Sequence, residues 1–472
     1  MRKLILVGLV LQLQACALVG PDYLAPQTAV DLDQTFIGQQ QVMTEQVLYK
    51  TVEPEVNWWK QLNDDALNNL IALSLQQNTD LRIAMANLAS SRAVLVESET
   101  GLQPTIDAEG SVERQRLPGY QTGSNNDSAD DETVTSVGLG LGWELDLFGQ
   151  VRRAIEAATA NIAVQEALLA DVQRLVIADV AAAYIEYRGA QERQKVIERN
   201  ITNQRKTLEL TQSMASEGAS SDLDVARARA QLTLTLSLLP TVKNDTEAAR
   251  NRLATLTSQD IRQVEQQLST EHTLLTLPNV IAVGEPAGLI RRRPDIKAAE
   301  RKLAQATAQV GVNTADLFPK VSLNGNIGFA SDTFSELDAS GAFNYGIGPA
   351  ISWNVFNRDA IKARIQQAEA NVDMQLAEYD RTVLNALEEI NSYLAEHGYE
   401  RQRRQALQTS VEASAESVEL VQARYREGVE SFLAVLDAER TLLTSEQELT
   451  NSNIALNQSL IMIYRALGGS WQ

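Results

Sequence analysis

Apolar residues recur at intervals of seven over the final helical stretch of the chain. Between Phe356 and Leu467 there is no proline, and the two glycines are Gly398 and Gly428. Heptads sustained over such a length predict long helices that pack side by side as in coiled coils. The apolar heptad positions are Ile365, Val372, Tyr379, Ala386, Tyr393, Val411, Val418 and Tyr425.

A turn is predicted within this stretch at Gly428. Glycine readily adopts the left-handed conformation that ends many helices, and Ser431 has a side chain preferred at the start of a helix. The segment from Tyr425 to Arg440, YREGVESFLAVLDAER, is therefore predicted to be the tip of an antiparallel helical hairpin. The whole hairpin is expected over about 356–467.

An earlier part of the chain has the same pattern. Its first helix is expected to start after Gly149 and to end near Gly218, about 100 Å away at the standard helical rise. Ser221 or Asp222 would cap a returning helix that ends near Leu256. A first hairpin is thus predicted over about 149–256. Its heptad positions are Ile155, Ile162, Leu169, Val176, Ala183, Ala190 and Ile197.

Before each hairpin the apolar period changes to two, which predicts β-strands. Strands are expected at about 104–116, 133–147, 319–330 and 343–355. One face of each is apolar and the other is small or polar. In the second strand, for example, Val137, Leu139, Leu141 and Trp143 alternate with Gly138, Gly140, Gly142 and Glu144.

The chain repeats itself, and the repeat determines its organisation. Pro104 before the first strand matches Pro319, and Gly218 at the first tip matches Gly428 at the second. The predicted parts are a signal peptide (1–15), an N-terminal arm (16–56), a first repeat (57–270) and a second repeat (271–468).

The N-terminus predicts a secreted lipoprotein. The apolar run from Leu4 to Leu13 is too short to span a membrane and suits a signal peptide. Cys16, the one cysteine of the chain, lies where a bacterial lipobox places the acylated residue, although Gln14 departs from the usual lipobox residue. Ordinary cleavage after Ala17, an A-x-A pattern, is the alternative. The lipoprotein interpretation is favoured because it explains the single cysteine.

Composition excludes several functions. The formal net charge of −20 argues against nucleic acid as a partner, because phosphates would be repelled. His272 and His397 are too few and too scattered for a metal site or a catalytic triad. No enzymatic activity and no cofactor are expected, apart from covalent lipid on Cys16.

The strands lead to a channel hypothesis. Their length suits tilted membrane-crossing strands, but four strands cannot close a barrel, since known barrels start at about eight. Several chains would have to contribute strands around a rotation axis. The alternative is a soluble four-stranded sheet packed on helices. The signal peptide and the lack of a partner helix for the sheet favour the barrel.

Several motifs resemble those of the TolC-like outer-membrane factors, specifically the outer-membrane efflux lipoproteins of the NodT type. They lie at 16–23 (CALVGPDY), 57–60 (NWWK), 289–296 (LIRRRPDI), 317–319 (LFP), 143–149 (WELDLFG) and 352–356 (SWNVF). Together they cover the chain from about residue 16 to 468.

The resemblance implies a mixed α and β membrane protein that forms a homotrimer. Its twelve-stranded barrel in the outer membrane of a Gram-negative bacterium would continue into a periplasmic helical barrel. It implies as partners a periplasmic adaptor protein and an inner-membrane pump, commonly of the proton-driven RND type. Cys16 would carry N-acyl and S-diacylglycerol groups.

The resemblance also implies a periplasmic gate at Leu433, Asp437 and Arg440. Asp437 and Arg440 are one helical turn apart and are able to pair. Around a threefold axis the leucines would form an apolar plug and the carboxylates a cation-selective constriction. The alternative is that Asp437 makes only a surface pair. The hairpin tips, expected to contact the adaptor, are Gly218, Ser221, Leu223, Gly428 and Ser431.

The two hairpins are not equivalent, because Arg227 in the first repeat matches Asp437 in the second. The second hairpin is therefore expected to move and the first to stay fixed. The predicted function is passive conduction of drugs or other small toxic compounds in a tripartite efflux system. A type I secretion or metal-efflux channel, a periplasmic coiled-coil scaffold and an envelope hydrolase are the alternatives.

Overall fold

The computed structural model describes residues 18–26, 36, 48–117, 130–268, 274–275, 277–278 and 280–469. The chain divides into two units, and each combines segments that are distant in sequence. The first unit contains residues 1–27, 87–166 and 298–379, and the second contains 28–86, 167–297 and 380–472. The predicted signal peptide and Cys16 lie outside the described residues. The predicted division into arm and repeats stays a prediction.

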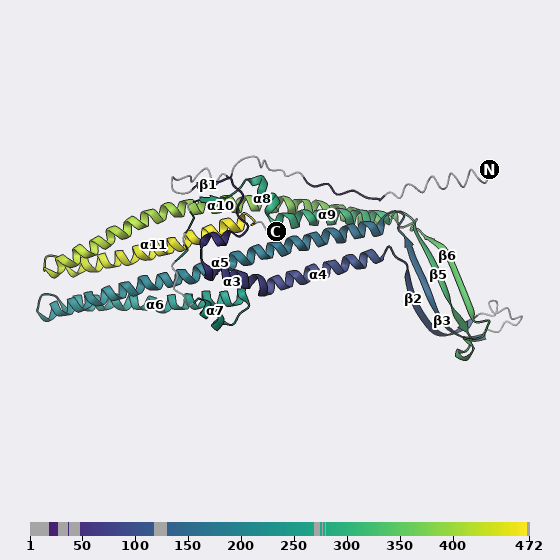
Figure 1. Ribbon diagram of the computed structural model, residues 1–472, viewed down its shortest axis with the longest axis horizontal. Helices are drawn as coiled ribbons and strands as arrows, with labels where there is room; N and C mark the ends of the chain where they lie inside the picture. The colour runs from purple at the N-terminus through teal and green to yellow at the C-terminus, as the bar shows by residue number, and fades with distance from the viewer. Residues whose placement is uncertain are drawn as a thin grey trace. The chain divides into compact units, whose positions relative to one another are not determined.

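The first unit is built around a four-stranded antiparallel sheet in the order β2-β3-β5-β6. The strands lie side by side, with α4, α5, α9 and α10 attached at one end (Figure 1). Their bounds are β2 (Thr105–Leu117), β3 (Asp130–Leu145), β5 (Lys320–Ser331) and β6 (Phe343–Ser352). The strands of the two repeats thus join directly, because β3 pairs with β5.

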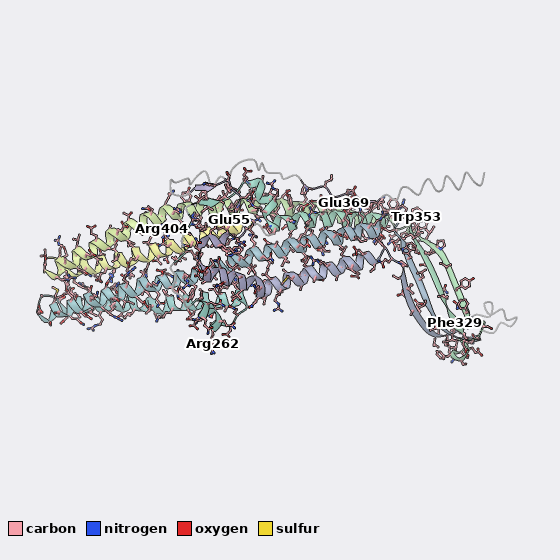
Figure 2. The ribbon with its side chains drawn as sticks, in the orientation of Figure 1. Glu55, Arg262, Phe329, Trp353, Glu369 and Arg404 are labelled. Atoms are coloured by element: carbon pink, nitrogen blue, oxygen red, sulfur yellow. The ribbon has the colours of Figure 1, made fainter. Side chains whose placement is uncertain are left out.

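Strand β6 ends at Ser352, three residues before the expected end. The next residue, Trp353, makes a hydrogen bond through its side chain. The indole nitrogen of Trp353 donates to the carbonyl oxygen of Leu317 at 3.0 Å. In the first repeat Trp143 donates in the same way to Leu102 at 3.1 Å. Each repeat therefore has one tryptophan hydrogen-bonded at the helical end of the sheet. Figure 2 labels Trp353 at this end.

An N-terminal segment, residues 18–26, packs against the strand-to-helix corner of the first unit. The amide of Val19 donates to the carbonyl oxygen of Phe148 at 3.3 Å. Arg153 at the start of α5 is 2% exposed, and its Nη2 donates to Asp22 Oδ1 at 2.7 Å. Since buried arginine needs partners for its donors, this contact fixes the segment to the helix.

The long helices carry the heptad positions as expected. Their bounds are α4 (Thr79–Thr100), α5 (Gln150–Ser216), α6 (Asp222–Thr257), α9 (Pro294–Ala315), α10 (Arg358–Arg426) and α11 (Phe432–Ala466). None of the described helices combines the length and the apolar character that a membrane crossing requires.

Smaller elements of the second unit surround the hairpins. They are β1 (Leu48–Lys50), η2 (Trp58–Leu62), α3 (Asp65–Gln77), α7 (Ile261–Gln267), β4 (Val280–Ala282) and α8 (Pro286–Arg292). Strands β1 and β4 form a parallel pair. Trp58 stacks on Tyr464 of α11 with 4.8 Å between ring centroids, and Tyr184 of α5 donates to Asp64 at 2.7 Å. These contacts join early and late parts of the chain in one core.

Candidate functional site

Both hairpin tips have the geometry that their sequences predict. Gly218 and Gly428 adopt backbone φ angles of 78° and 74°, values that residues with a Cβ atom rarely adopt. Ser221 caps α6 and Ser431 caps α11, each by accepting a backbone N–H three residues later. The two tips are therefore built by the same local chemistry.

Matching leucines lie beside both tips at the same distance from the cap. Leu223 and Leu433 are each 57% exposed. Burial of an apolar side chain is worth about 1.5–3 kcal/mol, so an exposed leucine at each tip is available for a contact outside this chain. Gly218, Ser221, Gly428 and Ser431 are exposed as well.

The second tip is fastened to the first by a small apolar cluster. Its buried members are Ala228, Tyr425, Phe432, Val435 and Leu436. The rings of Tyr425 and Phe432 are 5.7 Å apart. The hydroxyl of Tyr425 lies 3.1 Å from Ser220 Oγ, at the first tip. One aromatic residue thus packs within the second hairpin and hydrogen-bonds to the first.

The predicted gate residues do not form the pair that their spacing allows. Asp437 is exposed and makes no ion pair within the described part of the chain. Arg440 instead donates from Nε to Oε1 of Gln231 on α6 at 2.7 Å. Gln231 is 3% exposed, and a buried amide oxygen needs a donor. Arg440 thus binds a buried acceptor on the other hairpin instead of the neighbouring Asp437.

Sequence reasoning missed Glu439, between the two charged gate residues. It is 6% exposed and accepts hydrogen bonds from Thr207 on α5 and from Gln422 Nε2 on α10, the latter at 3.0 Å. Burial raises the pKa of its carboxyl group. The signal was present in the sequence, because Glu439 shares a helical face with Val435, Leu436 and Leu443.

One more contact between the hairpins lies farther from the tips. Asn200 of α5 donates to Glu446 of α11 at 2.5 Å, and Arg199 binds the same carboxylate at 3.1 Å. Helix α11 is therefore held to the first hairpin at successive levels, by Arg440 near the tip, by Glu439, and by Glu446. Tyr425 at the end of α10 adds a contact at the tip itself. Leu433 and Asp437 remain on the exposed side of α11.

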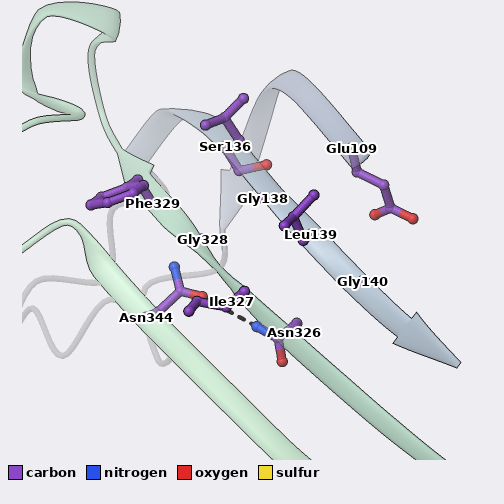
Figure 3. A pocket seen from close by; sticks show the side chains of 11 residues that line it. Glu109, Ser136, Gly138, Leu139, Gly140, Asn326, Ile327, Gly328, Phe329 and Asn344 are labelled. Atoms are coloured by element: carbon purple, nitrogen blue, oxygen red, sulfur yellow. Dashed lines mark hydrogen bonds between the residues drawn. The ribbon is translucent and has the colours of Figure 1, made fainter. Parts of the chain in front are cut away.

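The sheet provides a second surface of interest, with polar groups on one face. Ser111 Oγ and Ser136 Oγ are 2.8 Å apart on that face, and Asn326 Nδ2 donates to Asn344 at 3.2 Å. Figure 3 shows this hydrogen bond in a hollow that Glu109 also lines. Gly138 and Gly328 face each other in the ladder, and a Cβ on Gly328 would lie 2.6 Å from the backbone of Val137. Small residues are thus required where the two repeats meet.

Nothing in the described part of the chain forms a cluster of metal-ligating residues. His397 is 1% exposed, and its Nδ1 lies 2.9 Å from Ser459 Oγ. This histidine therefore belongs to the core between α10 and α11. His272 and the acylation candidate Cys16 lie outside the described residues.

Comparisons with known proteins agree with these features. The family model for outer membrane efflux proteins matches residues 70–259 and 287–469. The solvent efflux pump outer membrane protein SrpC of Pseudomonas putida is 31% identical, covering 98% of this chain and 97% of its own. The antibiotic efflux pump outer membrane protein ArpC of the same species is 30% identical, covering 97% and 93%.

Among solved structures, the outer-membrane channel OprN superposes with a TM-score of 0.88 at 37% identity. That match covers 96% of this chain and all of the other. The fold is therefore that of the TolC-like outer-membrane channels, and the protein is a channel component rather than an enzyme. The chain belongs to the outer membrane efflux protein family and is the outer-membrane channel of an efflux system.

Proposed function

We propose that three copies of the chain form one channel that carries small toxic compounds from the periplasm to the exterior. The names of the relatives, which refer to solvent and antibiotic efflux pumps, support small organic compounds as cargo. A periplasmic adaptor and an inner-membrane pump of the RND type would deliver them. The two repeats would serve as the structural halves of each subunit.

The sheet supports a twelve-stranded barrel shared by three chains. Strands β2 and β6 form its two edges, and copies related by a threefold axis would pair these edges and close the ring. Its apolar face is exposed in one chain, as expected for a surface that meets lipid. The exposed fractions are 73% for Val112, 69% for Ile347 and 73% for Ile351. The polar face would then line the lumen.

The arrangement of α11 carries the gate proposal. This helix exposes Leu433 and Asp437 while Arg440, Glu439 and Tyr425 attach its hairpin to the other. Around a threefold axis the exposed side chains would converge, and the carboxylates would form a cation-selective ring. Opening would require the second hairpin to release its contacts with the first.

Planar-bilayer conductance tests the gate. Asp437→Ala should raise conductance and reduce cation selectivity, because the ring loses its charge. Asp222→Ala, an exposed carboxylate at the first tip, is the matched control and should leave both unchanged. Wild-type conductance and selectivity in Asp437→Ala would refute the gate.

The anchor and the barrel have separate tests. Cys16→Ser should abolish fatty-acid labelling, and persistent labelling would refute acylation at this residue.

A trimeric barrel should change its mobility in an SDS gel on boiling. A species that migrates as a monomer before and after boiling, and that washes off membranes with carbonate, would refute the barrel.

A further inference from the structure

A cavity lies between the two hairpins, beside the buried Glu439. Its volume is about 570 Å³, and its walls come from α5, α10 and α11, which Figure 1 shows running towards the tips. Thr207 and Gln422, the two donors to Glu439, are among the residues that line it. Small-molecule sites commonly have volumes of about 300–1,000 Å³. The cavity is therefore large enough for a drug-sized compound that contacts both hairpins.

Part of the cavity wall is apolar. Leu210 of α5, Val418 of α10 and Leu442 of α11 line it, so each of the three helices contributes one large apolar side chain. Val418 is 9% exposed, and the two leucines are partly buried. A ligand that covers the accessible part of these side chains removes apolar surface from water, which is favourable. The wall therefore favours a compound with an apolar body.

Two residues of α10 with opposite charges also line the cavity. Glu419 and Arg426 are two helical turns apart, about 10 Å along the helix axis. Both are exposed, and neither makes a hydrogen bond or an ion pair within the described part of the chain. Arg403 on the same helix, by contrast, binds Glu400 and Glu448. Along α10 the cavity thus has a free carboxylate and, two turns closer to the tip, a free guanidinium.

A third free charge lies on the wall that α5 contributes. Lys206 lines the cavity, and it likewise has no hydrogen bond or ion pair among the described residues. It is level with Gln422, because Gln422 Nε2 donates to Oγ1 of the adjacent Thr207 at 3.3 Å. The carboxylate of Glu446 is not free, since Arg199 binds it. The free charges are therefore two cations and one carboxylate.

This set of free charges favours a ligand that carries both signs. A simple anion would bind Arg426 and Lys206 but would leave Glu419 without a partner, and a simple cation would do the reverse. A charge that a ligand covers without pairing costs free energy. A rigid apolar body keeps two ligand charges apart and loses little conformational freedom on binding. An aromatic zwitterion combines these properties.

We propose that the cavity binds an aromatic zwitterion, with a carboxylate at one end of its ring system and an ammonium group at the other. The carboxylate binds the guanidinium of Arg426 through two parallel N–H donors, and the ammonium group binds Glu419. Lys206 strengthens the attraction for the carboxylate, and the rings lie on the apolar wall. One chain supplies the whole site, so the proposal holds independently of the proposed channel.

Isothermal titration of the purified protein in an uncharged detergent tests the proposal. The probe is a biphenyl with a carboxylate on one ring and an aminomethyl group on the other, both para to the bond between the rings. Its methyl ester keeps only the positive charge, and the acid without the aminomethyl group keeps only the negative charge. The zwitterion should bind about tenfold more tightly than either, because one charge-assisted hydrogen bond accounts for at least that ratio.

Two variants assign each ligand charge to its partner. In Arg426→Gln the zwitterion should bind no more tightly than its methyl ester, because the carboxylate has lost its main partner. In Glu419→Gln the zwitterion should bind no more tightly than the acid without the aminomethyl group. Arg205→Gln and Glu416→Gln remove the same charges from exposed positions that do not line the cavity, so both should keep the wild-type preference.

Hydrogen exchange followed by mass spectrometry locates the bound ligand. The zwitterion should slow exchange in residues 203–210 and 415–426, which line the cavity, and should leave α4 unchanged. Equal affinity for the three compounds, the wild-type preference in Arg426→Gln or Glu419→Gln, or slowed exchange only outside these two segments would each overturn the proposal. Planar-bilayer conductance is a separate measurement. A protein that binds the zwitterion but forms no channel would refute the proposed function and keep the site.

Discussion

Arg440 on α11 donates a 2.7 Å hydrogen bond to Gln231 on α6, although Asp437 is one turn away on its own helix. The two helices belong to different hairpins, so the bond holds the proposed moving part to the proposed fixed part. A hydrogen bond that involves a charged group contributes about 1.5–3 kcal/mol. The contact is therefore strong enough to affect a gate whose two states differ by a few kcal/mol.

Gln231→Leu should increase the open probability of the channel by about tenfold or more, because Arg440 loses its acceptor. Single-channel recording in planar bilayers measures this change. Thr233→Val, at an exposed position on the same helix, should behave as the wild type does. An open probability that is the same in Gln231→Leu and Thr233→Val would show that the bond does not hold the gate.

Glu439 predicts a pH dependence of the same hairpin contact. Its pKa is raised, mainly by burial, so the folded state favours the protonated carboxyl. The stabilisation of the folded state by Glu439 is complete below the ordinary pKa of glutamate. It is lost as pH rises through the raised pKa that Glu439 has in the folded state. Glu439→Gln, which resembles the protonated form in shape, should flatten this part of the profile of unfolding free energy against pH.

The comparison for that experiment is Glu446→Gln. Glu446 also joins α11 to the first hairpin, but it binds Arg199 and Asn200. Its substitution removes a charge pair without removing the buried carboxyl of Glu439. If both variants change the pH profile by the same amount, burial of Glu439 is not the cause.

We expect the imidazole of His397 to destabilise the folded protein in acid. Burial lowers its pKa from 6.5 to about 4, and Tyr49 and Arg401 are the titratable groups that face it. Since the folded state favours the neutral ring, its stabilisation is present above pH 6.5 and is lost as pH falls to about 4. The full loss is about 3 kcal/mol.

Thermal unfolding of the wild type and of His397→Gln between pH 7 and pH 4 measures this contribution. The variant should be less stable at pH 7, because the glutamine does not fill the same space, but its stability should fall less steeply in acid. Parallel profiles for the two proteins would assign the acid sensitivity to other groups.

The sequence predicted the elements that depend on local chemistry. Gly428 and Ser431 indicated the tip because a left-handed glycine and a serine cap act within a few residues of each other. The contact between Arg440 and Gln231 was not predictable, since it joins helices from two repeats. Glu439 could have been noticed as a charge on an apolar face, but only the fold shows that Thr207 and Gln422 are its partners.

Arg153, at the other end of α5, also makes contacts with a segment distant in sequence that could not be predicted from the sequence. Its guanidinium binds the carbonyl oxygens of Val19 and Gly20 as well as Asp22. Arg153→Met keeps the bulk of the side chain but removes these bonds, so the N-terminal segment should detach. Chymotrypsin should then cleave after Tyr23 faster than in the wild type, as followed by mass spectrometry.

Arg152→Met is the matched control, because Arg152 binds Asp146 at its own corner and does not contact the segment. Faster cleavage in both variants would indicate that the whole corner has loosened. Unchanged cleavage in Arg153→Met would show that other contacts, such as the bond from Val19 to Phe148, are sufficient to hold the segment.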